Sequence, residues 1–310
     1  MTRELQLHSR IPIHDYIRFA RRFAREAMHQ RRQGRNDRPP IVIHRPDPST
    51  WQDSEVTAAW LGHATVLINF LGTWLITDPA LARRIGVRFA GITIGPRRIT
   101  RPGLTVRDIP SLDLILISHA HMDHLDLATL GQLPRQTPVV THRGVGDLLK
   151  RFDQVTEVGW GEHLEQAGVS IEGIGARHWG ARTITDRQRG FGGFLLEKEG
   201  RRILFAGDTA YTNAYTAIAR GGPVDLAILP IGAYDPWIAN HASPEEAWAM
   251  SRDMQARFVL PVHHSTFRLS REPLEEPLRR LIAAAGNQSD TVVGTRIGET
   301  IRLPVEGVGT

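Results

Sequence analysis

The chain has 310 residues, of which 14 are histidine and none is cysteine, and its formal net charge is +5. Hydrophobic residues make up 41% and charged residues 23%, which is typical of a globular protein and excludes wholesale disorder. Without cysteine there is no disulfide, iron–sulfur cluster, thiolate zinc site or cysteine nucleophile, so histidine nitrogens and carboxylate oxygens are the ligands left for a metal.

Residues 1–50 are predicted to form a basic N-terminal segment. Apolar residues at helical spacing predict an amphipathic helix over 13–32 flanked by arginines, and four prolines make 35–49 an extended connector. Such a helix either packs on the body with a solvated basic face or lies on an anionic membrane surface. The start of the chain lacks the apolar core of a signal peptide, so we expect a cytoplasmic protein, with peripheral contact at the inner face of the membrane as an option.

Residues 51–310 are predicted to form one catalytic domain. The run LDLILIS at 112–118 is apolar on both faces, which is typical of a strand buried between two layers. Ser243 and Glu246 form a capping-box pattern at the start of a helix. Two sets of strands that share one core, with helices outside, predict an α/β fold with a four-layer αββα sandwich. The predicted strands are 57–60, 65–70, 74–77, 112–118, 138–141, 169–174, 193–197, 202–206, 224–230, 258–262 and part of 291–302, and the predicted helices are 125–133, 146–152, 244–255 and 274–285.

The segment that follows the buried strand contains four potential metal ligands within six residues. His119 and His121 are two residues apart in an extended stretch, so their rings project to the same side. Asp123 and His124 follow where the chain turns into a helix. Four ligands this close together suit two neighbouring metal ions better than one.

Three further candidates follow the ends of other predicted strands. They are His178, Asp208 in the tripeptide Gly-Asp-Thr, and His263, next to which His264 is an alternative. Because ligands of α/β proteins bind at strand ends, these side chains are expected to meet the first four. Five histidines and two aspartates can fill two sites of four or five ligands if Asp208 bridges them.

At these residues the chain resembles the metallo-β-lactamase superfamily, whose signature is H-x-H-x-D-H followed by spaced His, Asp and His. Further motifs resemble its N-acylphosphatidylethanolamine phospholipase D branch, from about Trp60 to Phe267. They are WLGHAT (60–65), TDP (77–79), HW (178–179), GDTAY (207–211), PIGAY (230–234), HASPEEA (241–247) and HHSTF (263–267).

The resemblance implies a ligand set and a cofactor. One metal would be bound by His119, His121 and His178, and the other by Asp123, His124 and His263, with Asp208 between the two. The register of the HHSTF motif favours His263 over His264. Zn²⁺ suits imidazole and carboxylate ligands best, and Fe or Mn would also fit.

The resemblance also implies roles around the metals. Asp123 would orient a metal-bridging hydroxide and accept its proton, and His241 would stabilise or protonate the leaving group; packing at the start of a helix is the alternative for His241. His63 and Asp78 would support the ligands from behind. Four aromatic residues would line the substrate pocket, with a place in the core as the alternative: Trp179, Tyr211, Tyr234 and Trp237.

We therefore expect a dinuclear hydrolase that cleaves a phosphodiester in a phospholipid-like substrate. The alternative is a lactone or carboxyl-ester hydrolase, including a sugar-phosphate lactonase, that uses the same metals. RNA processing is the third interpretation, and it is disfavoured because the charge of the chain outside residues 1–45 is close to neutral. The sequence does not define an oligomeric state.

Overall fold

The computed structural model describes residues 43–89, 92–183, 186 and 188–304. The helix predicted over 13–32 and most of the connector lie outside these ranges, so the boundary near residue 50 stays a prediction. Across the described ranges, none of the helices combines the length and the apolar character needed to cross a bilayer.

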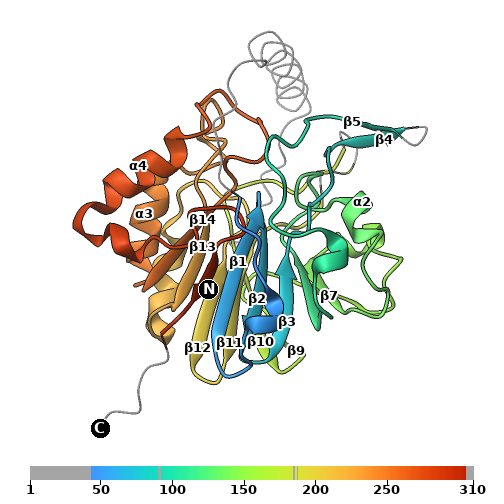
Figure 1. The fold of residues 1–310 in the computed structure, drawn as a ribbon, viewed down its shortest axis with the longest axis horizontal. Coiled ribbons are helices and arrows are strands. Elements are labelled where there is room, and N and C mark those ends of the chain that lie inside the picture. The colour runs from blue at the N-terminus through green and yellow to red at the C-terminus, as the bar shows by residue number, and fades with distance from the viewer. Residues whose placement is uncertain (1–42, 90–91, 184–185, 187, 305–310) are drawn as a thin grey trace.

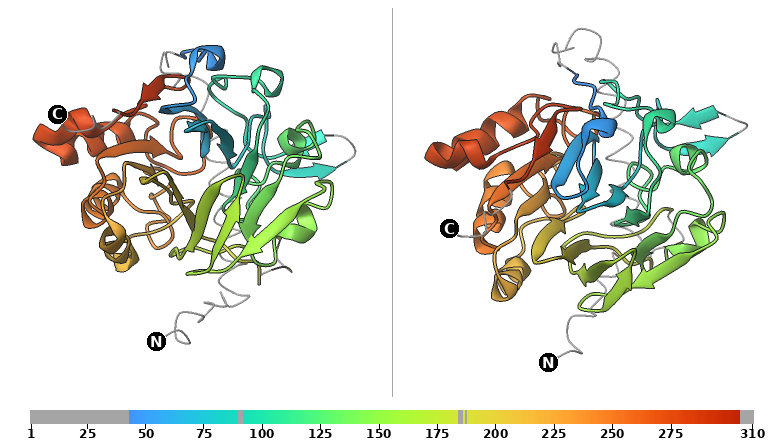
Figure 2. Two further views of the ribbon diagram at one scale, coloured as in Figure 1. Left: turned by 90° about the horizontal axis from the view of Figure 1, so that it is seen from below. Right: turned by 60° about the horizontal axis from the view of Figure 1, so that its bottom comes forward.

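The strands form two large sheets that face each other (Figures 1 and 2). The first sheet has seven strands in the order β15 (Thr300–Arg302), β1 (Val56–Gly62), β2 (Thr65–Phe70), β3 (Thr73–Thr77), β6 (Leu114–Ile117), β7 (Val139–His142) and β8 (Val155–Val158). The second has six strands in the order β14 (Phe258–Val262), β13 (Leu226–Pro230), β12 (Arg201–Phe205), β11 (Gly193–Lys198), β10 (Val169–Ile174) and β9 (His163–Gln166). A separate hairpin, β4 (Val87–Phe89) and β5 (Ile92–Ile94), projects from the body.

Three apolar clusters show why these strands form a layered structure. The central cluster joins the sheets: Ile68 of β2 and Leu116 of β6 belong to it together with Phe194 of β11. Residues at alternate positions point the other way, so Leu67 and Ile115 enter a second cluster on the outer face of the first sheet. A third cluster lies under the helices on the second sheet. The four-layer α/β sandwich predicted from the sequence is confirmed.

Helices cover the outer faces of both sheets. Figure 1 shows α3 (Pro244–Asp253) and α4 (Glu276–Ala285) beside β13 and β14, and the single-turn α2 (Leu127–Leu130) on the opposite side. Five 3₁₀ helices complete the described elements: η1 (Pro48–Thr50), η2 (Val106–Asp108), η3 (Gly146–Leu148), η4 (Asn213–Gly221) and η5 (Gly286–Thr291).

Some predicted elements are shorter than expected. The helix predicted over 125–133 is a single turn, because Gly131 and Pro134 limit its continuation. The prediction of a helix over 146–152 was wrong: only the 3₁₀ turn Gly146–Leu148 forms, and it closes where the Leu149 amide donates to the Gly146 carbonyl at 2.9 Å. Of residues 291–302, only β15 is a strand.

The capping box at the start of α3 is confirmed. Ser243 Oγ accepts a hydrogen bond from the Glu246 amide at 3.2 Å, and Glu246 Oε2 accepts one from the Ser243 amide at 2.8 Å. Ser243→Ala is therefore expected to lower the free energy of unfolding by about 1 kcal/mol, whereas Ser243→Asp, which keeps a capping oxygen, should stay close to wild type. Urea titration measures both values, and equal loss in the two variants would contradict the cap assignment.

Candidate metal centre

The seven predicted metal ligands lie together at one edge of the two sheets. The chain leaves β6 after Ile117 and enters the segment 118–124, which carries four of the ligands. The other three follow β10, β12 and β14: His178, Asp208 and His263. Because β12, β13 and β14 are parallel, and β3 and β6 are parallel in the opposing sheet, their C-terminal ends bring these side chains to a common place.

One group of side chains centres on His121. Its Nδ1 lies 2.8 Å from Nε2 of His119 and 3.3 Å from Nε2 of His178. Asp208 Oδ2 lies 3.8 Å from the same His178 nitrogen. The ligand atoms of these four residues are all within 4.8 Å of one another, and three of the residues are buried.

A second group adjoins the first through Asp208. His124 Nε2 and His263 Nε2 both lie 3.1 Å from Asp208 Oδ2. Asp123 Oδ2 is 3.6 Å from the same atom of His124 and 3.5 Å from that of His263. A single carboxylate oxygen of Asp208 therefore faces histidines of both groups, as the sequence-based ligand scheme requires.

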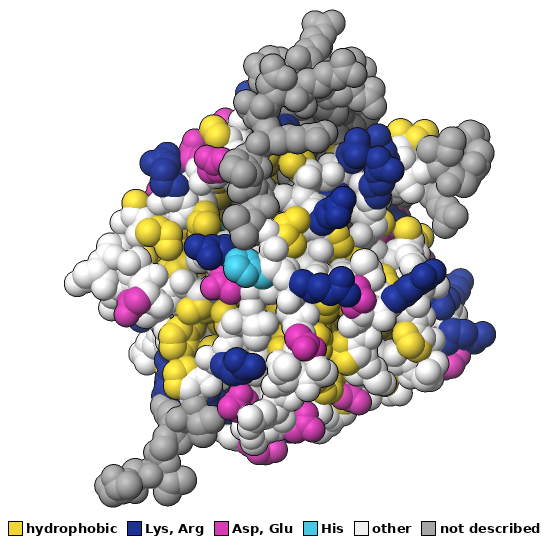
Figure 3. All heavy atoms as spheres, in the orientation of Figure 1, with side chains coloured by type: hydrophobic (Ala, Val, Ile, Leu, Met, Phe, Trp, Pro, Cys, Tyr) yellow, Lys and Arg dark blue, Asp and Glu magenta, His cyan; other side chains and the backbone are white. Residues whose placement is uncertain are grey.

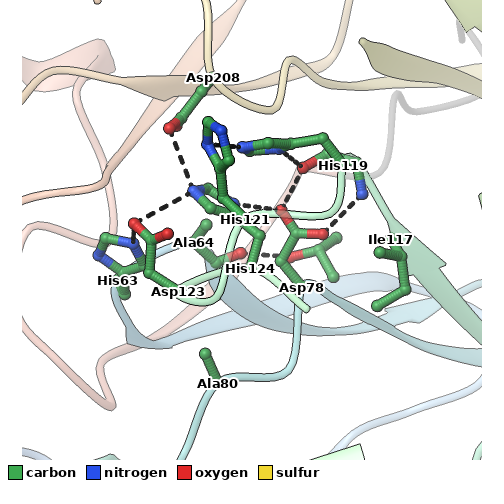
Figure 4. A network of polar contacts seen from close by, with 12 residues as sticks. His63, Ala64, Asp78, Ala80, Ile117, His119, His121, Asp123, His124 and Asp208 are labelled. Carbon is green, nitrogen blue, oxygen red and sulfur yellow. Dashed lines mark hydrogen bonds and ion pairs between the residues drawn. The ribbon is translucent and has the colours of Figure 1, made fainter. Parts of the chain in front are cut away.

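Hydrogen bonds behind the ligands fix which ring nitrogens face inward (Figure 4). His124 Nδ1–H donates to Asp78 Oδ2 at 2.6 Å, and Asp78 also accepts from the amide and hydroxyl of Ser118. Since the Ser118 hydroxyl donates to Asp78, its oxygen accepts from His119 Nδ1–H at 2.9 Å. His178 Nδ1–H donates to the carbonyl of Asn240 at 2.9 Å. All three histidines thus direct Nε2 into the site, which is how proteins orient imidazole ligands.

Several buried polar atoms at the centre have no hydrogen-bond partner within the described part of the chain. They include Asp208 Oδ1, His241 Nδ1 and His263 Nδ1, whereas His263 Nε2 has only its 3.1 Å contact with Asp208 Oδ2. Buried polar groups without a partner are costly, and a cation that accepts their lone pairs would remove that cost. Together with the exclusively nitrogen and oxygen donors, this shows that the His and Asp clusters are able to bind metal ions.

Burial and nearby carboxylates divide the histidines into two protonation classes. Burial and the neighbouring His178 lower the pKa of His121 to about 3. Burial also acts to lower the pKa of His124 and His263, but the carboxylate of Asp208 and its acidic neighbours more than offset it: the pKa of His124 lies well above its usual value, and that of His263 is raised to about 9. The carboxylates thus favour the protonated forms of His124 and His263, whereas burial lowers the pKa of His119, His178 and His241 and favours their neutral forms. A cation bound between His124, His263 and the carboxylates would take the place of those protons.

The backbone at the site holds unusual conformations. His63, Asp78 and His263 have φ values of 55°, 32° and 64°, in the left-handed region that residues other than glycine rarely occupy. Such conformations cost about 1 to 3 kcal/mol each and persist where the surrounding fold enforces them. Three of the nine non-glycine residues with positive φ in the described part of the chain thus form or support the two groups.

His63 and His241, which the sequence placed near the metals, both lie at the site. His63 Nε2 is 2.9 Å from Asp123 Oδ2, and the residue is buried. His241 Nδ1 is 3.8 Å from Asp208 Oδ2, and its ring lies 5.0 Å from that of His178. By contrast, His264 stacks on Trp60 and pairs with Ser265, so His263 is the member of this pair that joins the groups.

The four aromatic residues take different positions. Trp179 packs against the edge of His121, with ring centroids 4.6 Å apart, and Tyr211 is 39% exposed beyond Asp208. Tyr234 donates its hydroxyl to Glu276 of α4, so the polar end of its ring is bound within the fold. Trp237 is buried, and its indole N–H donates to the carbonyl of Leu269.

Three contacts at the site had no role in the sequence prediction. The hydroxyl of Ser118 and the carbonyl of Asn240 orient His119 and His178. Arg182 Nη1 donates to the carbonyls of Ala120 and Leu125 at 2.9 Å, and so joins the two ends of the ligand segment. The sequence could have indicated the role of Ser118, because this residue adjoins the ligand motif. The carbonyl of Asn240 and the distant Arg182 have no local sequence signal.

Comparison with known proteins gives the family. Residues 73–264 match the Beta-lactamase superfamily domain. The chain is 32% identical to N-acyl-phosphatidylethanolamine-hydrolyzing phospholipase D 1 of Caenorhabditis elegans, over 77% of this chain and 73% of the relative. It is 33% identical to the mitochondrial N-acyl-phosphatidylethanolamine-hydrolyzing phospholipase D of Saccharomyces cerevisiae, covering 78% of this chain and 54% of that relative. The fold matches Igni18, a metallo hydrolase from Ignicoccus hospitalis, with a TM-score of 0.60, 21% identity and coverage of 81% of this chain and 99% of that chain.

The chain therefore belongs to the β-lactamase superfamily, and it is a metal-dependent hydrolase. Within the superfamily, its homologues include N-acylphosphatidylethanolamine-hydrolysing phospholipases D over most of its length, as the motifs around the metal ligands predicted.

Proposed function

We propose that the protein is a dinuclear metal-dependent phosphodiesterase that acts on phospholipid-like substrates. The observation that carries this proposal is the identity of 32% and 33% with two chains named as phospholipases D that hydrolyse N-acyl-phosphatidylethanolamine. The two adjoining ligand groups, which share one oxygen of Asp208, support the number of metals.

The ligand assignment follows the two groups. His119, His121 and His178 would hold one ion, and Asp123, His124 and His263 the other, with Asp208 shared. These imidazole and carboxylate donors suit Zn²⁺, with Fe or Mn as alternatives. When bound, the pair of ions would generate hydroxide near neutral pH and neutralise charge on the phosphoryl oxygens.

The residues beside the ligands supply the proton transfers. Asp123 would orient the attacking water and accept its proton, and the 2.9 Å contact with His63 Nε2 supports the carboxylate in that position. His241, whose Nδ1 lies 3.8 Å from Asp208 Oδ2, would stabilise the leaving oxygen or, in its imidazolium form, protonate it. Asp78 would act through His124, whose ring it orients.

The substrate would enter past aromatic residues. Trp179 at the edge of His121 and the half-exposed Tyr211 are placed to contact it, while Tyr234 and Trp237 would shape the loops that carry His263 and His241. The helix predicted over 13–32 would add peripheral contact with the inner face of the membrane from a cytoplasmic protein.

A substrate panel tests the reaction class. The full chain, loaded with Zn²⁺, is assayed with an N-acylphosphatidylethanolamine, a water-soluble phosphodiester, a single-stranded RNA and a set of lactones, including a sugar-phosphate lactone. Release of phosphatidic acid from the phospholipid is expected. Turnover of lactones alone would replace the phosphodiesterase proposal with the lactonase alternative, and turnover of RNA alone would replace it with RNA processing.

A pair of histidine variants links the panel to the metal centre. His121→Ala removes the ligand at the centre of the first group, so metal content and hydrolysis are expected to fall together, with activity reduced at least about 100-fold. His163→Ala removes an exposed histidine of β9 and serves as the matched control with unchanged values. Elemental analysis and the same assay give both quantities, and full activity of His121→Ala would contradict the ligand assignment.

A further inference from the structure

The hairpin formed by β4 and β5 lies outside both large sheets. Figures 1 and 2 show the two strands projecting from the body beyond α2. The chain enters the hairpin after Asp78, which supports His124, and returns from it to the loop that follows His263: the Ile99 amide donates to the Thr266 carbonyl at 2.8 Å. The hairpin is therefore anchored at the rim of the metal centre.

Two apolar side chains of the hairpin face solvent. Val87 and Ile94 are directly paired in the antiparallel register, and 56% and 60% of their surface is exposed. They are the most exposed large apolar residues in the described part of the chain. The pair forms a small exposed apolar surface on a projecting element.

The sequence around the hairpin is basic and contains no acidic residue. Residues 79–107 contain seven arginines and no acidic residue. Arg84 and Arg97 face each other across an antiparallel bridge, a position in which like charges destabilise the pairing. Within the described ranges, the exposed arginines of this region form no ion pair with a carboxylate: Arg83, Arg84, Arg97, Arg101 and Arg107. Figure 3 shows Lys and Arg side chains gathered beside the hairpin.

We propose that this hairpin and its arginines bind the anionic surface of a phospholipid bilayer. Val87 and Ile94 would enter the boundary between headgroups and acyl chains, and Arg84 and Arg97 would bind lipid phosphates through their planar guanidinium groups. The phosphates also resolve the repulsion between the two facing arginines. The aliphatic pair distinguishes this surface from a nucleic-acid site, in which aromatic side chains stack on bases.

Membrane binding by the hairpin would serve the proposed function and in this respect rests on it, because a phospholipid substrate has to be taken from a bilayer surface. The Ile99–Thr266 hydrogen bond and the stacking of Arg98 on Phe267 connect the base of the hairpin to the loop that follows His263. Membrane binding itself requires no turnover, so its test and the substrate panel fail independently.

Binding to vesicles tests the proposal with the full chain. Co-sedimentation is measured with vesicles of phosphatidylcholine alone and of equal parts phosphatidylcholine and phosphatidylglycerol, and preferential binding to the second is expected. Arg84→Gln/Arg97→Gln removes two charges from the surface and should weaken binding by about 25-fold, at about fivefold per basic residue. Val87→Ser/Ile94→Ser should weaken binding at equal charge.

The matched control is Arg220→Gln/Arg279→Gln, which removes the same charge from exposed positions on η4 and α4. It should bind like the wild type, and thermal unfolding confirms that all variants are folded. Equal binding to both vesicles, or unchanged binding of the two hairpin variants, would overturn the proposal. Binding to RNA that falls in the arginine variant but not in the Val87/Ile94 variant, without binding to vesicles, would assign the surface to nucleic acid instead.

Discussion

Asp208→Ala is expected to abolish hydrolysis and to lower the metal content of the purified protein. Asp208 Oδ2 is the oxygen that faces both ligand groups, at 3.1 Å from His124 and His263 and 3.8 Å from His178. Without it, each of two bound cations would lose a ligand, and no shared negative charge would lie between them. We expect a loss of activity of at least about 1,000-fold, which corresponds to about 4 kcal/mol of transition-state stabilisation.

The control for this substitution is another buried aspartate of the same half of the fold. Asp225 accepts a hydrogen bond from the Arg202 amide, and its Oδ1 lies 3.3 Å from Arg201 Nη1. It belongs to neither ligand group. Asp225→Ala should therefore lower the free energy of unfolding, since it leaves buried donors without a partner, but keep the metal content per folded molecule. Metal analysis and urea unfolding of both variants separate the two effects. Equal metal content in Asp208→Ala and wild type would contradict the shared-ligand assignment.

Gly207→Ala is expected to be strongly destabilising and to displace Asp208. Gly207 has a φ of 62°, and an added Cβ would lie 2.7 Å from the carbonyl oxygen of Gly192 and 2.8 Å from Cβ of Ser118. Both neighbours belong to packed segments, one in each half of the site, so neither can move without disturbing the ligands. The left-handed conformation and the steric overlap together should lower the free energy of unfolding by about 2 to 4 kcal/mol.

Gly200→Ala separates the two causes. Gly200 has a similar φ of 75°, in the turn between β11 and β12, but an added Cβ would meet no atom within 4 Å. The left-handed backbone alone should therefore lower the free energy of unfolding of this variant by about 1 to 2 kcal/mol, and its activity should be unchanged. Denaturant unfolding and the hydrolysis assay measure both variants. If both substitutions lower the free energy of unfolding equally and both variants stay active, the tight packing around Gly207 is not what holds Asp208 in place.

The sequence predicted most strands of the two sheets, because buried strands leave either a continuous apolar run, as in 258–262, or an alternating one, as in 169–174. The strands 65–70, 169–174 and 258–262 have the predicted bounds, and the run at 112–118 contains β6. The candidate ligands were equally visible, since histidine and aspartate follow predicted strands at 119–124, 208 and 263. Their meeting in space follows from the parallel strands that carry them.

Other elements left no such pattern. Strands β8 and β9 read VTEV and HLEQ, with partly exposed residues and no apolar run, and the β4–β5 hairpin lies in a stretch dominated by glycine and arginine. The contacts of Arg182 with two backbone carbonyls depend on tertiary structure alone. Periodicity records which faces are buried, so it cannot report an element that projects into solvent or a side chain that reaches across a loop.

The candidate ligands come from both sheets of the sandwich: four from the segment after β6 in the first sheet, and three from loops after strands of the second. A cation bound among them would cross-link the two sheets, because separating the sheets would move its ligands apart. Its binding energy would then count toward resistance to unfolding, since the unfolded chain has no such preassembled set. The same ligand atoms would then contribute both to the free energy of unfolding and to catalysis.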